Sequence, residues 1–149
     1  MDTSVFGGYF DTEFEMFTVP LFERIDNGIF IVLVSTVTEE ELAPAPKWIK
    51  ELVSGLPDEG IEMLEATVEA VELASAYIAE NVVGMTSYAD CLHIAIATIN
   101  NADVLVSWNF KHIVNVERIR GYNSINIKNG YHELEIRSPR ELLSYEDEN

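Results

Sequence analysis

Short apolar runs separated by longer amphipathic stretches give the chain its overall pattern. The runs Ile29–Val34, Val104–Ser107 and Leu134–Arg137 are rich in β-branched or aliphatic residues, which is typical of strands buried in a parallel sheet. Asp2–Phe6 reads as the end of a further strand that enters a turn at Gly7 and Gly8. Because these runs alternate with helical patterns, we predict an α/β domain with a mainly parallel central sheet over residues 1–149.

Apolar residues recur at helical spacing in the stretches between the predicted strands. The spacing predicts a helix over Phe14–Ile25, which Pro20 breaks or kinks, and a long helix from Ile61 to about Glu80. A basic helical stretch over Lys111–Arg120 leads to Gly121. Tyr88–Ile99 is apolar on nearly every face, so we expect that helix to be buried.

Asp90 stands out because it lies inside this buried helix. A carboxylate is seldom buried without a partner, since desolvating its charge costs several kcal/mol. Ser87 and Asp90 fit a capping box, with Ser87 as the N-cap, but Asp90 also suits a ligand-binding role, and the two are compatible. Thr38 and Glu41 fit a second capping box that opens the helix after Ile29–Val34.

Composition narrows the classes of protein that this chain can belong to. Its 149 residues are 48% hydrophobic and suffice for one buried core, and no apolar run approaches the ~20 residues that span a bilayer. No basic and apolar leader opens the chain, and its single cysteine, Cys91, falls in the buried helix. We therefore expect a cytoplasmic protein with no membrane segment. The net charge of −17 disfavours general attraction to nucleic acid and suits a basic partner or a divalent cation.

Polar groups follow several of the predicted strands. Asp2 ends the first strand, Glu41 follows Ile29–Val34, and Asn109 follows Val104–Ser107. The carboxyl ends of parallel strands share one edge of a sheet, and Asp90 opens a helix that can reach the same edge. Carboxylate and amide oxygens without cysteine suit a hard cation, Mg²⁺ or Mn²⁺, which activates water for attack on a phosphodiester.

These motifs resemble those of the PIN-domain ribonucleases, the family that includes the VapC toxins. The matching segments cover nearly the whole chain: DTSVFGG at 2–8, the strand followed by Glu41 and Leu42, and ADCLHIAIATINNADVLVSWNF at 89–110. The resemblance implies a three-layer α/β/α domain that cleaves RNA with Mg²⁺ or Mn²⁺. By position, Asp2, Glu41 and Asp90 would hold the metal, and Asn109 stands where the family usually has a further Asp.

The resemblance also implies partners and an alternative. An RNA substrate, a small basic antitoxin protein and a homodimer are expected. The rival interpretation is a PIN-like module without nuclease activity that binds a partner protein or RNA, which Asn109 in place of an acid favours. In the family the first Asp ends a central strand, but only Met1 precedes Asp2 here, so either the start lies upstream or most of that strand is missing.

The histidines divide into one with a candidate partner and two without. His93 lies one turn after Asp90, where it is either a core histidine or a group that orients Asp90 or touches substrate. His112 and His132 match no pattern and are expected at the surface.

A few further side chains have two interpretations each. Lys111, Arg118 and Arg120 form a basic cluster that either compensates a helix end or contacts phosphates. Trp108 either packs in the core or stacks on a base, and Ser4 either orients Asp2 or shapes the turn.

Overall fold

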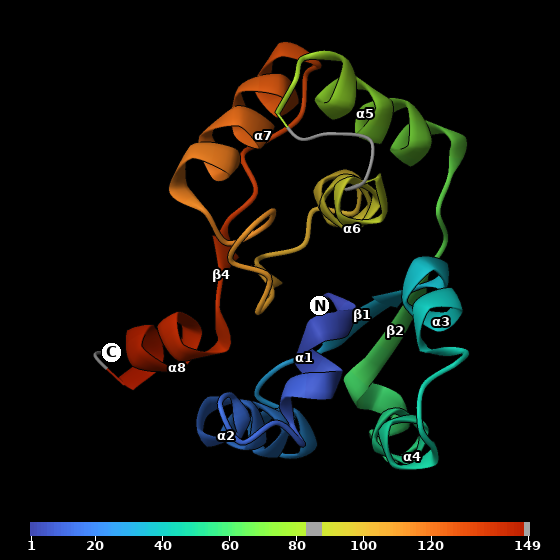
Figure 1. Cartoon of the computed structure of the whole chain (residues 1–149), viewed down its shortest axis with the longest axis vertical. Coiled ribbons are helices and arrows are strands. Elements are labelled where there is room, and N and C mark those ends of the chain that lie inside the picture. Colours follow the sequence, from blue (N-terminus) through green and yellow to red (C-terminus); the bar gives the residue numbers. More distant parts are fainter. Residues whose placement is uncertain (83–87, 148–149) are drawn as a thin grey trace.

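Two pairs of short parallel strands lie at the centre of the protein, and helices surround them (Figure 1). The structure is a computed structural model that describes residues 1–82 and 88–147. Its strands are β1 (Val32–Ser35), β2 (Ile61–Leu64), β3 (Leu105–Val106) and β4 (Ile136–Arg137). Its helices are α1 (Thr3–Gly8), α2 (Glu15–Asp26), α3 (Thr36–Leu42), α4 (Lys47–Ser54), the 3₁₀ turn η1 (Asp58–Gly60), α5 (Val68–Ala79), α6 (Tyr88–Ile99), α7 (Val116–Lys128) and α8 (Pro139–Asp147). The predicted α/β class is confirmed.

The strands form two two-stranded sheets instead of the one sheet that we expected. β1 pairs with β2, and β3 pairs with β4, both in parallel. The first two residues connect the pairs, because the Met1 amino group donates to the carbonyl of Leu33 and the Asp2 N–H donates to the carbonyl of Val106, both at 3.1 Å. In Figure 1 the N-terminus accordingly lies between β1 and the segment that carries β3 and β4.

Both strand pairs end on the same side of the molecule. The two residues that follow Asp2 bond to segments that lie beyond the strands. The Thr3 hydroxyl donates to Glu41, which follows β1, and the Ser4 hydroxyl accepts from the N–H of Trp108, which follows β3. We predicted that β1 and β3 belong to one parallel sheet, and their placement in separate sheets shows that this prediction is wrong. This shared edge brings the candidate residues together.

The prediction of a long helix from Ile61 to Glu80 is wrong in its first part. Ile61–Leu64 is strand β2, in register with β1 from Val32 opposite Ile61 to Ser35 opposite Leu64. The helix begins only at Val68, where the Thr67 hydroxyl accepts from the Ala70 N–H at 3.2 Å and caps it. Ile61 and Leu64 suit a strand as well as a helix, and pairing with β1 decides between them.

Helix α1 replaces the predicted end of a strand at Asp2–Phe6. Asp2 has an extended backbone, but its side chain caps the helix that begins at Thr3. Helix α2 continues through Pro20. Proline has no N–H to donate to the carbonyl of Met16, but Met16 is 72% exposed, so water can satisfy that carbonyl.

Helix α7 begins later than the predicted Lys111–Arg120 stretch and does not stop at Gly121. Asn115 caps it by accepting from the Arg118 N–H at 3.2 Å. A Cβ at Gly121 would lie 2.9 Å from a methyl carbon of Val82, so glycine here permits close packing and does not end the helix.

The core has two parts that meet at the strands. One gathers around α6, as its apolar faces predict, with Cys91 and Ile94 inaccessible to solvent and α5 and α7 packed over it. The other joins α1, α2, β1 and β3 through Val5, Phe6 and Trp108. Within residues 1–82 and 88–147, no helix is long and apolar enough to cross a membrane.

Candidate functional site

Asp2 lies at the edge where the strands end, and Ser4 fixes its orientation. The Asp2 side chain is buried, and its Oδ1 accepts from the Ser4 N–H at 3.1 Å and from the Ser4 hydroxyl. The Ser4 Oγ in turn accepts from the Trp108 N–H at 2.9 Å. Ser4 therefore both orients the carboxylate and ties the first turn to the loop after β3, so the two roles considered for it coexist.

Glu41 reaches the same region from α3, and it does not form the capping box that we expected. Ser35 caps this helix by accepting from the Thr38 N–H at 3.4 Å, which places Thr38 inside the helix. The Glu41 carboxylate instead accepts from the Thr3 hydroxyl at 2.8 Å and lies 2.5 Å from His93 Nε2. Glu41 is thus held by groups from α1 and α6.

The contact with His93 sets the charge state of Glu41. The hydrogen bond from His93 lowers the pKa of Glu41, and the Thr3 hydroxyl adds to this effect, whereas partial burial opposes it. The His93 side chain is only 4% exposed and Glu41 is 36% exposed. Buried His93 therefore orients Glu41, and not Asp90 as one interpretation held.

Asp90 occupies the first turn of α6 and is half-buried. Burial, followed by the negative charge of Asp2, raises the pKa of Asp90; the histidines 112 and 93 lower it, and Glu41 raises it slightly. The carboxylate makes no hydrogen bond to another residue that the structure describes. The capping role considered for Ser87 lies outside the described residues. Asp90 thus shares its surroundings with both other acids.

Asn109 shapes the loop after β3 with the same oxygen that a metal would need. Its side-chain carbonyl accepts from the N–H groups of Lys111 at 3.2 Å and His112 at 3.0 Å. Its own N–H donates to the Ser107 hydroxyl at 2.9 Å. These bonds give the residue a structural role, and its role as a ligand stays a prediction.

His112 is the residue that the sequence analysis missed. It was expected at the surface, but its Nδ1 is buried without a hydrogen-bond partner among the described residues. The Asn109 turn fixes its backbone from one side, and its carbonyl accepts from the Tyr122 hydroxyl at 2.7 Å. An Asn three residues before a His is a weak signal for such a turn, so the sequence alone did not place His112 beside Asp90. His132 is exposed, as predicted.

The donor set suits a hard cation, although the side chains are engaged with one another. Among the residues described, no group of three or more His, Cys, Asp or Glu side chains is arranged to hold a metal ion. Asp2 is bound to Ser4, and one Glu41 oxygen serves both Thr3 and His93.

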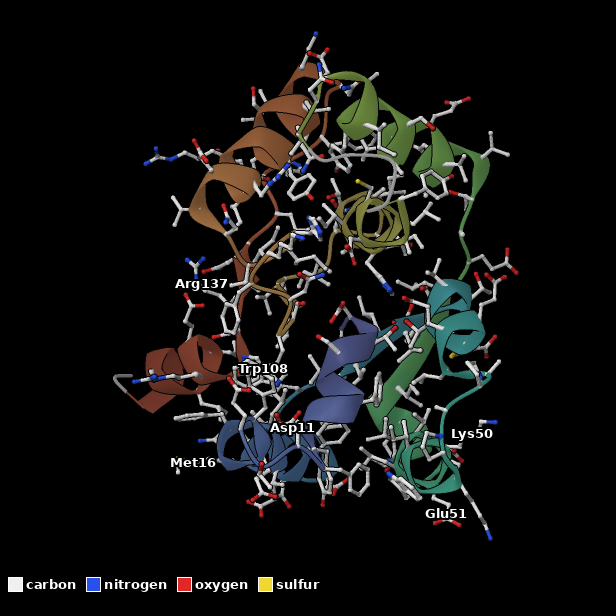
Figure 2. The ribbon with its side chains drawn as sticks, in the orientation of Figure 1. Asp11, Met16, Lys50, Glu51, Trp108 and Arg137 are labelled. Atoms are coloured by element: carbon white, nitrogen blue, oxygen red, sulfur yellow. The ribbon has the colours of Figure 1, made fainter. Side chains whose placement is uncertain are left out.

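Trp108 packs inside the protein and does not present its ring to a ligand. Its indole N–H donates to the Thr18 hydroxyl of α2 at 2.9 Å, and its ring stacks on Phe14 with centroids 4.4 Å apart. Trp108 is labelled in Figure 2. The core interpretation is therefore confirmed. Lys111 and Arg120 are exposed, which suits either role considered for the basic cluster.

Comparisons of the chain with protein-family models, with curated proteins and with solved structures found no match. The resemblance to PIN domains therefore rests on the sequence motifs. What the fold adds is that the charges of Asp2 and Glu41 both act on Asp90.

Proposed function

We propose that this protein is a metal-dependent endoribonuclease of the PIN type, with a three-layer α/β/α domain, acting in the cytoplasm. One observation carries the proposal: the negative charges of Asp2 and Glu41 both act on the half-buried carboxyl of Asp90. Two carboxylates that oppose the ionisation of a third form a site whose charge a divalent cation would relieve.

The three acids would hold the metal, and their neighbours would orient them. Ser4 fixes Asp2, while Thr3 and His93 fix Glu41. Bound Mg²⁺ or Mn²⁺ would supply an activated water and neutralise charge on the phosphate of RNA. Asn109 would assist from the loop after β3.

Replacing Asp90 with Asn tests this proposal. The variant keeps the side-chain shape but loses one ligand charge, and Asp103→Asn is the matched control because Asp103 is exposed. We expect Mn²⁺ to raise the melting temperature of the parent and the control but not of Asp90→Asn, since only a ligand of the native state stabilises it. RNA cleavage should require the metal and disappear in Asp90→Asn. Equal Mn²⁺ stabilisation of all three proteins, or cleavage by the variant, would contradict the proposal.

A second candidate function is a PIN-like module that binds RNA or protein without cutting. The specific observation in its favour is that three of the four expected ligands, Asp2, Glu41 and Asn109, already use an oxygen to accept hydrogen bonds. A parent protein that binds RNA without Mn²⁺ and leaves it intact would support this function.

The expected partners belong to the same proposal. A net charge of −17 suits association with a small basic protein, such as an antitoxin, through electrostatic steering. A homodimer completes the proposed assembly. Light scattering of the protein alone and with a candidate basic partner measures both.

A further inference from the structure

Phe110 exposes its ring two residues after the buried Trp108. It is 50% exposed, and its ring meets that of Trp108 edge to face, with centroids 5.9 Å apart and an interplanar angle of 61°. Because Trp108 is itself fixed by Thr18 and Phe14, the Phe110 ring rests on a rigid support. Of the two aromatic residues in this loop, Phe110 is the one whose ring is open to a ligand.

Hydrogen bonds hold the backbone on both sides of Phe110. Its N–H donates to the carbonyl of Trp108 at 3.0 Å. On the other side, the N–H groups of Lys111 and His112 donate to the side-chain carbonyl of Asn109 at 3.2 Å and 3.0 Å. An aromatic side chain that is ordered before binding loses less conformational entropy when it takes up a ligand.

Phe110 lies beside the acids of the candidate site. The Ser4 hydroxyl contacts both the carboxylate of Asp2 and the N–H of Trp108. Two residues of extended chain span at most about 7 Å, so the Cα of Phe110 lies within this distance of the Cα of Trp108. A polynucleotide with one phosphate at the acids therefore has a neighbouring base within reach of Phe110.

The charge of the chain is divided unevenly along the sequence. Residues 51–106 carry ten acids and no Lys or Arg, whereas residues 107–128 carry four of the nine Lys and Arg residues and one acid. This second segment is the loop after β3 together with α7, which lies on the side of the molecule away from α3 and α4 (Figure 1). A polyanion is therefore attracted to this segment, although the net charge of the whole chain is −17.

Most of these positive charges are available to a ligand. Within the described part of the chain, Lys111, Arg118 and Arg120 form no salt bridge, whereas Lys128 pairs with Glu80 at 2.7 Å. Lys111 is exposed and directly follows Phe110. A flat exposed ring beside a free ammonium group is the combination that binds single-stranded nucleic acids, since the ring takes a base and the charge takes a phosphate.

We propose that Phe110 stacks on an unpaired base of the RNA and that Lys111 contacts a phosphate next to that base. This inference rests on the proposed nuclease function, because it assigns the contacts of the same site to its substrate. An aromatic ring accepts the face of any base, so these two contacts strengthen binding without reading a sequence. A base inside a duplex is already stacked on its neighbours, so Phe110 favours unpaired RNA.

Fluorescence anisotropy of a short, labelled oligoadenylate tests the stacking. The reference protein carries Asp90→Asn, and no divalent cation is present, so the RNA is not cut. We expect Phe110→Ala in this protein to weaken binding by about fivefold to 150-fold, the range that stacking of one base on an aromatic side chain contributes. Phe110→Leu should weaken binding nearly as much, because leucine is apolar but has no flat ring, whereas Phe110→Trp should preserve it.

Three controls separate a base on Phe110 from other causes of weaker binding. Trp48→Ala removes an aromatic residue that is 56% exposed and flanked by lysines on α4, and it should leave binding unchanged. An abasic strand of the same length should bind the reference protein and Phe110→Ala equally, because it has phosphates but no base to stack. Lys111→Gln should weaken the binding of both strands, since its contact is to phosphate.

Several results would overturn the proposal. These are equal binding of the oligoadenylate by the reference protein and Phe110→Ala, an equal loss in Trp48→Ala, a loss that persists with the abasic strand, or no saturable binding. If Phe110→Ala fails to fold, as its melting temperature would reveal, Phe110→Leu and Phe110→Trp decide in its place. Cleavage of the RNA by the parent protein with Mn²⁺ is measured separately. Cleavage together with binding that does not depend on Phe110 would reject the stacking and retain the nuclease, whereas binding that depends on Phe110 without cleavage would reject the nuclease and retain the stacking.

Discussion

The carboxylate of Glu41 and the Nε2 of His93 lie 2.5 Å apart, although 52 residues separate them in the sequence. This contact fastens α3 to α6. Because Asp90 lies one turn before His93 on α6, the contact also sets how far Glu41 stands from Asp90. The pair therefore couples the stability of the fold to the geometry of the candidate site.

A double-mutant cycle of Glu41→Gln and His93→Gln should give a coupling free energy of about 1 kcal/mol. Hydrogen bonds to charged groups contribute roughly 1.5–3 kcal/mol, and the exposure of Glu41 reduces this through solvent screening. Urea unfolding at pH 7 measures each corner of the cycle. Glu40→Gln is the control, since Glu40 is exposed on the same helix and should change stability by less than about 0.5 kcal/mol.

The Glu41 contribution should depend on pH in a defined direction. Its pKa in the folded protein lies below the ordinary value of 4.5. The unfolded chain therefore binds the proton more readily, so the stabilisation is present above pH 4.5 and is lost as the pH falls through the folded pKa. Unfolding of the parent and of Glu41→Gln from pH 7 to pH 3 measures the difference in their free energies of unfolding. A difference that does not shrink toward pH 3 would contradict this assignment.

Asp90→Asn should stabilise the metal-free protein at neutral pH. The pKa of Asp90 is raised above its ordinary value of 3.8, chiefly by burial, so the folded state holds the proton more tightly than the unfolded state. Stability then falls as the pH rises from 3.8 through the folded pKa. We expect a gain of about 1 kcal/mol or less at pH 7, because the group is partly screened by solvent, and no gain near pH 3. Chemical unfolding at both pH values, with Asp103→Asn as the control, measures this gain in stability. A gain that persists at pH 3 would mean that packing, and not the charge of Asp90, causes it.

The helix from Tyr88 to Ile99 shows what the sequence can predict. It is apolar on nearly every face, so burial and helical form follow from pattern alone, and the structure has the same bounds. The pattern gave the wrong element at Ile61–Leu64. The spacing of its apolar residues fits both a helix and a strand, and pairing with β1 makes it a strand. The pattern also failed at Thr3–Gly8, because an acid before a short apolar run suits a strand end and a helix cap equally.

For the candidate site, the sequence predicted where the acids lie but not which residues bond to them. Topology predicted that Asp2, Glu41 and Asp90 approach one edge, because the carboxyl ends of parallel strands meet there. Their hydrogen-bond partners could not be predicted, since the contacts of Thr3 and His93 with Glu41 depend on how α1 and α6 are rotated. No local pattern encodes such rotations.

Gly8→Ala should destabilise the protein, whereas Gly7→Ala should not. A Cβ at Gly8 would lie 2.7 Å from the Trp108 indole nitrogen, which is fixed by its bond to Thr18. Overpacking of this kind costs about 1–3 kcal/mol. A Cβ at Gly7, in the same helix, meets nothing within 4 Å, and alanine favours a helix by up to about 1 kcal/mol. Thermal unfolding of the two variants should therefore shift in opposite directions, and an equal loss in both would contradict the close approach to Trp108.

Asn126→Asp should make stability fall steeply with rising pH. Asn126 is fully buried on α7, where its Oδ1 accepts from the Tyr77 hydroxyl and its Nδ2 donates to the hydroxyl of Thr98 and the Oδ1 of Asn123. Aspartate keeps the shape but loses both donors, and burial disfavours its ionised form, so its folded pKa is raised. The loss should be about 1–3 kcal/mol when the acid is neutral, and larger above its folded pKa. Urea unfolding from pH 5 to pH 8 measures the slope. Asn129→Asp, exposed at the end of the same helix, should show a loss within about 1 kcal/mol and little slope. A flat profile for Asn126→Asp would mean that water reaches this position and that the network joining α5, α6 and α7 is open to solvent.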